Sequence, residues 1–162
     1  MERKVLSVLV DNHVGVLTRV ASLFNQRGFN IDSLTVSATN NPDISRITIV
    51  TDGDEQVLEQ IVKQTGKLIE TRKVFKLQAD SALLRELLLI KLETNEQLIG
   101  VFREIAAIYK SKIIDLSPCS MVLELTGEPD KIDAFLEVLS QYNIIEMCRT
   151  GITALSRGEE QI

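Results

Sequence analysis

The spacing of hydrophobic residues in the first half of the chain alternates between a strand period and a helix period. Residues 4–10 are rich in valine and leucine, which is typical of a buried strand. From Val16 to Phe24 the apolar residues recur every three or four positions, which predicts an amphipathic helix, and Gly28 is a typical residue to end it. The same criteria predict strands over 31–39, 45–51 and within 67–77, a turn at 40–43, and a second helix that opens at Asp52-Gly53-Asp54.

The predicted order of these elements is β-α-β-β-α-β, which is the order of the ferredoxin-like fold. Right-handed crossover connections then place both helices on one face of a four-stranded antiparallel sheet. We therefore expect the first half of the chain to form one small α+β domain.

The second half repeats this order after the short polar connection 78–81. Its predicted elements are strands over 84–93, 112–116, 120–126 and 144–149, a helical stripe from Leu98 to Tyr109, and a helix over 129–139. Residues 156–162 resemble a loose tail. The sequence thus predicts two ferredoxin-like domains, over 1–78 and 82–162; the alternative is one such domain with a differently wound appendage.

The charge balance and the aromatic content argue against nucleic acid as a partner. The chain has 18 basic and 23 acidic residues and a formal net charge of −5, whereas a broad nucleic-acid surface needs a basic excess. Ferredoxin-like domains that bind RNA stack bases on aromatic residues of their central strands. Only 4% of this chain is aromatic, and the aromatic residues fall on or beside predicted helices or in an outer strand.

The few cysteine and histidine residues argue against a transition-metal site and against a disulfide scaffold. Cys119 and Cys148 belong to no CxxC pair, and His13 is the only histidine. Two isolated cysteines suit a reducing compartment. No apolar run is long enough for a signal core or a membrane span, so we expect a cytoplasmic protein.

Enzymatic motifs are missing from the sequence. His13 belongs to no recognisable nucleophile–base pattern, and the chain has neither a P-loop nor a GxGxxG phosphate loop. Acylphosphatases of this fold need an arginine in the first loop, and residues 11–15 contain none. Acidic pairs exist, as in any acidic protein, but none is distinguished by its setting. We therefore predict no catalytic residue.

The loop Asp11-Asn12-His13-Val14-Gly15 is the strongest candidate for a binding site. It leads from a buried strand into a helix, whose first turn has backbone N–H groups without internal partners and favours an anion. Gly15 lets a ligand approach the backbone, and the Asn12 amide can both donate and accept. The alternative is that Asp11 and Asn12 simply cap the helix, and local physics alone favours that alternative.

The residues around this loop resemble a known family. Asp11-Asn12-His13-Val14-Gly15-Val16-Leu17-Thr18-Arg19-Val20 resembles the opening of an ACT domain, a ferredoxin-like module that senses small molecules, mostly amino acids. The continuation from Ser22 to Val36 is similar to the small regulatory subunit of acetohydroxyacid synthase (acetolactate synthase). Stretches at 58–64, 112–115, 131–135 and 149–151 agree in the same order, although Met147-Cys148 departs from the small apolar pair usual there.

The resemblance implies a non-catalytic subunit that activates a catalytic large subunit and confers feedback inhibition by a branched-chain amino acid, usually valine. The large subunit of that family condenses pyruvate with pyruvate or 2-ketobutyrate. It uses thiamine diphosphate, magnesium and usually FAD, so these cofactors are expected on the partner and none on this chain.

The resemblance also implies a homodimer of ACT domains with the effector at the interface. The effector-binding residues it assigns are Asn12, Gly15, Val16 and Leu17 of one protomer, opposite Asn30 and Ile31 of the other. A dry aliphatic pocket near Ile31, Leu34 and Val36 would accept a branched side chain. The alternative for Asn30 is a turn residue after Gly28. His13 is expected to be an exposed loop residue or to tune the pocket, and the second domain to contact its copy or the large subunit.

Two other interpretations remain open on the sequence. The chain is then either a stand-alone ACT-domain amino-acid sensor that acts on another enzyme or regulator, or a pure interaction protein that binds no ligand.

Overall fold

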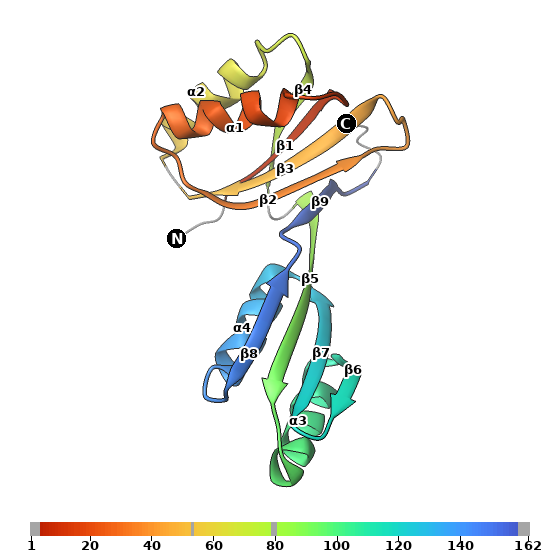
Figure 1. Ribbon diagram of the computed structural model, residues 1–162. Helices are drawn as coiled ribbons and strands as arrows, with labels where there is room; N and C mark the ends of the chain where they lie inside the picture. The colour runs from red at the N-terminus through yellow and green to blue at the C-terminus, as the bar shows by residue number, and fades with distance from the viewer. Residues whose placement is uncertain (1–3, 53, 79–80, 159–162) are drawn as a thin grey trace. The chain divides into compact units, whose positions relative to one another are not determined.

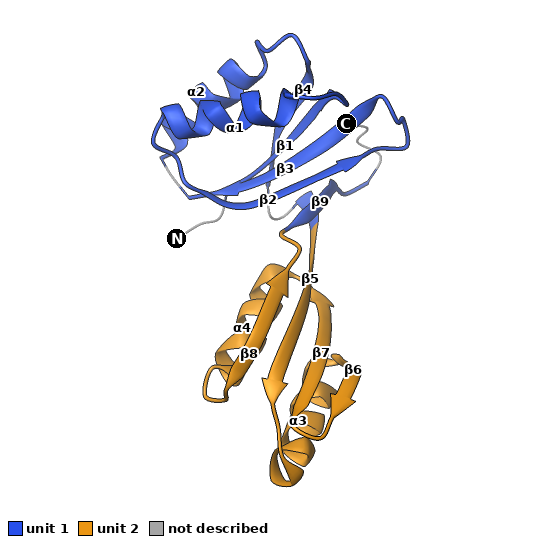
Figure 2. Ribbon diagram, in the orientation of Figure 1, with its two compact units in different colours: residues 1–83, 152–162 blue, residues 84–151 orange. Residues whose placement is uncertain are grey.

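The computed structural model describes residues 4–52, 54–78 and 81–158, and it divides the chain into two compact units. Unit 1 comprises residues 1–83 and 152–162, and unit 2 comprises residues 84–151 (Figure 2). Each unit contains a four-stranded antiparallel sheet with two helices on one face (Figure 1).

Unit 1 has the predicted ferredoxin-like order of elements. They are β1 (Lys4–Asp11), α1 (Val16–Gln26), β2 (Ile31–Ala38), β3 (Ile44–Thr51), α2 (Glu55–Thr65) and β4 (Thr71–Leu77), followed at the end of the chain by β9 (Thr153–Ser156). The strands are arranged as β2-β3-β1-β4, so β2 is an edge strand. Helix α2 is capped by Asp54, whose carboxylate accepts from Gln56 N at 2.9 Å; Gly53, part of the predicted helix opening, lies outside the described residues.

The core of unit 1 lies between the helices and one face of the sheet. Every second residue of β1 and β3 points to this face, and the three- and four-residue spacing of α1 brings Val20 and Phe24 onto it, both fully buried. The buried residues of this core are Leu6, Val8, Val10, Val16, Val20, Phe24, Ile47, Ile49, Leu58 and Ile61.

The opposite face of the same sheet is covered by the end of the chain. Val5 and Val50 face away from the helices, yet they are only 5% and 2% exposed. Ile152 N donates to Ser33 Oγ at 3.1 Å, and Ile152 and Ala154 are each 3% exposed. Burial of these side chains explains why the C-terminal segment belongs to unit 1.

The compact units differ at the C-terminus from the domains expected from the sequence, in which the second domain extends over 82–162. Residues 152–162 belong to unit 1 because β9 has apolar side chains that complete the cover of its sheet. The expected connection 78–81 contains residues 79 and 80, and the expected tail 156–162 contains residues 159–162; these lie outside the described residues.

Unit 2 repeats the ferredoxin-like order, which excludes the alternative of a differently wound appendage. Its elements are β5 (Ala82–Glu93), which begins in unit 1, then α3 (Glu96–Tyr109), β6 (Lys112–Ser117), β7 (Ser120–Gly127), α4 (Pro129–Leu139) and β8 (Ile144–Arg149). The strands are arranged as β6-β7-β5-β8, and β9 pairs with β5 outside this path. Asn95 caps α3 by accepting from Gln97 N and Leu98 N.

A charged cluster joins strands β5 and β8 and helix α4 of unit 2. Arg149 of β8 donates through Nε and Nη2 to both carboxylate oxygens of Glu86 at 2.7 Å, and through Nη1 to Asp133 of α4 at 3.0 Å. These hydrogen bonds, first of all those to Glu86, raise the pKa of Arg149 above its usual value. Glu86 is only 5% exposed, so loss of Arg149 would leave a buried carboxylate without its ion-pair partner.

No helix within the described ranges is long and apolar enough to cross a membrane.

Candidate functional site

Helix α1 starts without a side-chain cap. Its N-cap is Gly15, with φ of 89°, and no side chain accepts a hydrogen bond from the first turn. The left-handed φ favours glycine, since a Cβ is strained there. A Cβ on Gly15 would lie 3.7 Å from Nη2 of Arg19. The first-turn N–H groups are therefore available to an anion from outside this unit.

The capping alternative for Asp11 and Asn12 is wrong. Asp11 Oδ1 accepts from Arg72 Nε at 2.6 Å. Asn12 Nδ2 donates to the carbonyl oxygen of Pro42 at 2.8 Å. Both side chains thus form hydrogen bonds with groups outside helix α1, and the start of the helix has no side-chain cap.

The other residues of this loop and of the first turn of α1 differ in whether the side chain or only the backbone is accessible to a ligand. The side chain of Val16 is 3% exposed and packs in the core, so only its backbone N–H is at the helix start. Leu17 is 40% exposed and Val14 is 97% exposed, so both present apolar side chains to the surroundings. His13 is exposed, as expected for a loop residue.

Arg19 is a residue of this region that the sequence analysis did not assign to the site. Its Nη2 lies 2.7 Å from Oε1 of Glu70, beside Gly15. Position 19 is one helical turn after Gly15, which is the spacing that brings side chains back to the helix start. Arg19 therefore adds a positive charge next to the uncapped N–H groups, partly balanced by Glu70.

Asn30 and Ile31 lie at the start of edge strand β2. Asn30 is exposed and its amide donates to Asp32 Oδ1 at 3.0 Å. Its carbonyl oxygen accepts from Thr51 Oγ1 at 2.7 Å, and Ile31 packs partly against the core. These contacts fit the interpretation of Asn30 as a turn residue and leave its outer face accessible.

Within one protomer the two halves of the predicted site lie at opposite ends of the sheet. Asp11, just before the loop, pairs with Ile44 at the start of β3, whereas Ile31 pairs with Thr51 at its end. Seven strand steps separate these pairs, about 23 Å at 3.3 Å per residue. The described unit does not bring the loop and Asn30 together, so a site that uses both needs a second protomer.

The edge beside these residues exposes apolar side chains. Leu34 and Val36 of β2 pair with Ile49 and Ile47, so they point to the helix side of the sheet. They are nevertheless 37% and 42% exposed, because β2 is an edge strand and no described strand of this unit pairs with its outer edge. An edge strand with such side chains favours pairing with another chain.

No group of three or more histidine, cysteine, aspartate or glutamate residues within the described ranges is arranged to hold a metal ion.

Comparison with known protein families matches both units. Residues 6–73 match the AHAS small subunit-like ACT domain, and residues 85–158 match the family described as small subunit of acetolactate synthase. The two matches follow one another along the chain and together span both units.

Individual relatives match over almost the whole chain. The probable acetolactate synthase small subunit of Archaeoglobus fulgidus is 46% identical over 156 residues, which is 96% of this chain and 98% of that protein. The acetolactate synthase isozyme 3 small subunit of Escherichia coli is 42% identical over 159 residues, 98% of each chain. The crystal structure of the acetolactate synthase small subunit from Thermotoga maritima has a TM-score of 0.88 and 38% identity, over 99% of this chain and 100% of that chain.

Proposed function

The chain belongs to the family of acetolactate synthase small subunits, and from this premise we propose that it binds a branched-chain amino acid, valine first of all, and thereby regulates a catalytic large subunit. In this proposal the chain activates the large subunit and makes it sensitive to feedback inhibition. The thiamine diphosphate, magnesium and FAD of the reaction belong to the large subunit, and this chain contributes no catalytic group.

The observation that carries the proposal is the uncapped start of α1. A free amino acid has a carboxylate that the first-turn N–H groups of Val16 and Leu17 can bind, as helix N-termini bind anions. Gly15 leaves the backbone open to that approach because it has no Cβ. The aliphatic side chain of the ligand then lies among apolar groups such as Leu17.

A homodimer supplies the second half of the site. The 23 Å separation, estimated from strand geometry, rules out a site made of both halves within one protomer. A two-fold axis beside β2 pairs the loop of one protomer with Asn30 and Ile31 of its partner, and it does so twice. The exposed apolar edge of Leu34 and Val36 supports this pairing, since burial removes that area from water.

Inhibition through this site requires that the effector bind one state of the complex more tightly than the other. An effector held between two protomers meets that requirement when the interface differs between the active and inhibited states.

Reconstitution with an acetolactate synthase large subunit tests the proposal. We expect the chain to co-purify with the large subunit, to raise its acetolactate formation, and to make that activity fall with added valine. Calorimetric titration of the chain alone with individual amino acids separates ligand binding from the effect on the enzyme. Amino-acid binding without any stimulation of the large subunit would instead identify a stand-alone sensor.

A further inference from the structure

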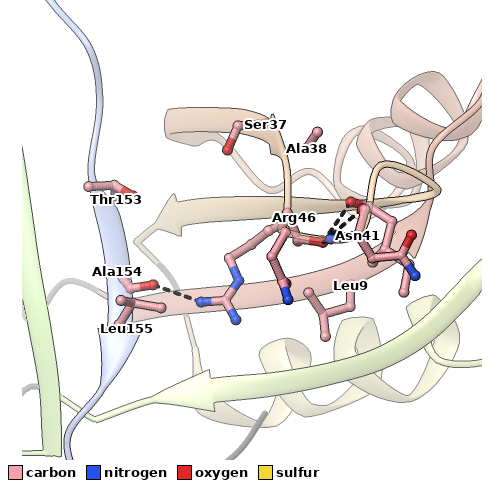
Figure 3. A pocket seen from close by; sticks show the side chains of 11 residues that line it. Leu9, Ser37, Ala38, Asn41, Arg46, Thr153, Ala154 and Leu155 are labelled. Carbon is pink, nitrogen blue, oxygen red and sulfur yellow. Dashed lines mark hydrogen bonds between the residues drawn. The ribbon is translucent and has the colours of Figure 1, made fainter.

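A pocket lies in unit 1, on the face of the sheet that β9 covers (Figure 3). Its volume is about 430 Å³, which is within the range of small-molecule sites. It is formed by β1, the β2–β3 hairpin and β9. Its lining residues include Leu9, Ser37, Ile44, Arg46, Thr153 and Leu155.

Arg46 is the one charged residue among those that line this pocket. Its Nη1 donates to the carbonyl oxygen of Ala154 at 3.1 Å, and its guanidinium carbon lies 5.9 Å from the centre of the Phe75 ring. Two contacts from different strands therefore hold the guanidinium in one place, and no carboxylate within the described ranges is paired with it. An immobilised guanidinium binds a carboxylate with little further loss of side-chain entropy.

The charges near the pocket also favour an anion. Lys73 pairs with Leu9 across β1 and β4, so its side chain is on the same face of the sheet. Asp11, which pairs with Ile44, is already engaged by Arg72 at 2.6 Å. Arg46 and Lys73 thus place two positive charges on this face of the sheet, while the Asp11 carboxylate is already paired.

The remaining walls combine aliphatic carbons with uncharged polar groups. Leu9, Ile44 and Leu155 supply aliphatic side chains. Ser37 lies opposite Arg46 in the β2–β3 register, and Thr153 is on β9, so each places a hydroxyl group at the pocket. One guanidinium with aliphatic walls suits a singly charged organic acid better than a polyphosphate, which needs several cations or a helix start.

We propose that this pocket binds a small aliphatic carboxylate, held by Arg46 through its carboxylate and by the aliphatic walls through its carbon chain. This site is distinct from the start of α1: it lies within one protomer, needs no partner, and offers no acidic group to an ammonium. Its occupant bridges the β2–β3 hairpin and β9, so binding also fastens the C-terminal strand to unit 1.

Amide NMR of the whole chain, deuterated and ¹⁵N-labelled, tests the proposal with isobutyrate as the probe. We expect isobutyrate to shift the amides of residues 37–46 and 153–155 with a Kd of about millimolar order, as a six-atom ligand allows. Isobutyramide, which has the same shape without the charge, should bind about tenfold more weakly. Inorganic phosphate serves as the competing anion.

Variants assign the binding to the pocket. Arg46→Gln should weaken isobutyrate binding about tenfold or more, while Arg46→Lys should keep part of it. Ser37→Phe leaves Arg46 in place and fills the pocket, so it should also abolish the shifts. Arg27→Gln, which removes an arginine from the end of α1, is the matched control and should change nothing.

The proposal is overturned if isobutyrate leaves the amides of both segments unmoved, if isobutyramide binds as well, or if phosphate binds more tightly. It is also overturned if Ser37→Phe and Arg46→Gln, with otherwise unchanged spectra, bind isobutyrate like the unmodified chain. Shifts confined to residues 12–18 would place the carboxylate at the start of α1 and likewise exclude the pocket. None of these results bears on valine regulation of the large subunit, which the reconstitution measures.

Discussion

The side-chain amide of Asn12 donates to the carbonyl oxygen of Pro42 at 2.8 Å, across 30 positions of sequence. The backbone N–H of Asn12 donates to the neighbouring carbonyl oxygen of Asp43, also at 2.8 Å. The loop before α1 is thus fastened by two hydrogen bonds to the turn between β2 and β3. Asn12 is a positioning residue of the loop as well as a proposed ligand contact.

Replacement of Asn12 should therefore affect both stability and the effector. Asn12→Ala removes the bond to Pro42, and we expect the free energy of unfolding to fall by about 0.5–1.5 kcal/mol, the usual net value of one hydrogen bond. Valine inhibition of the reconstituted enzyme should be lost while stimulation of the large subunit remains. Urea unfolding and the valine titration measure the two effects; an enzyme that stays fully valine-sensitive would exclude Asn12 from the site.

Gly15 offers a test that separates backbone strain from ligand contact. Gly15→Ala places a Cβ at φ of 89°, which costs about 1–2 kcal/mol, and blocks the approach to the first-turn N–H groups. Gly15→Asp adds a carboxylate where the carboxylate of the ligand is expected, so valine binding should be abolished. Calorimetry with valine measures both variants.

Gly28→Ala is the matched control for Gly15. Gly28 has φ of 71° with no atom within 4 Å of an added Cβ, so the same substitution is strained there too. We expect a similar loss of stability with unchanged valine binding. Equal valine binding by Gly15→Ala and Gly28→Ala would show that the backbone at Gly15 does not approach the ligand.

The exposed edge of β2 should decide the oligomeric state. Val36 is 42% exposed on the helix side of the edge strand, and a lysine there places a charge in the proposed interface. We expect Val36→Lys to shift the chain from dimer to monomer in light scattering after gel filtration, and to weaken valine binding with it. Ile69→Lys is the control, because Ile69 is 97% exposed in the turn before β4. A Val36→Lys protein that remains dimeric would place the interface elsewhere.

The helix and strand periods of the sequence predicted both ferredoxin-like orders because each core face follows a simple spacing, as Val20 and Phe24 do in α1. Strand β9 was not predicted, because four residues are too few to show the alternation of apolar and polar positions that marks a strand. A partial signal for it existed: β1 has two apolar residues, Val5 and Leu9, on the face that the predicted helices do not cover.

The predicted site followed from local sequence only in part. Gly15 and the helix start could be predicted because they depend on neighbouring residues. The bonds from Asn12 to Pro42 and from Arg72 to Asp11 join residues 30 and 61 positions apart, and such pairs are set by the tertiary fold. For that reason local physics favoured a helix cap that the structure does not contain.

The charged cluster of unit 2 should contribute strongly to its stability. Arg149→Met removes the partner of Glu86, which is 5% exposed, and we expect a loss of about 2–3 kcal/mol in the free energy of unfolding. Adding Glu86→Gln to this variant should recover part of the loss, since no buried charge is then unpaired. Urea unfolding of the two single variants and the double variant measures the coupling. Strictly additive losses would mean that the bidentate pair contributes nothing of its own.

The last prediction concerns Ile152, whose side chain covers the face of the first sheet that the helices leave open. Ile152 is 3% exposed, and Ile152→Ala should cost about 2–4 kcal/mol, as other large-to-small changes in a core do. Leu155→Ala is the matched control: Leu155 lies three residues further along, on β9, but is 58% exposed, so the loss of stability should be small. Ser33→Ala removes only the hydrogen bond to Ile152 N.

Hydrogen exchange resolved by peptide locates the effect of these changes. If the C-terminal strand stabilises unit 1, Ile152→Ala should speed exchange in β1 and β3 and leave the β5–β7 pair of unit 2 protected. The same reasoning predicts that deletion of residues 81–162 exposes Val5 and Val50 to water. An isolated ACT domain should then be less stable than unit 1, and adding β9 back should restore its stability. Unchanged exchange in β1 and β3 after Ile152→Ala would mean that the cover contributes no stability to this sheet.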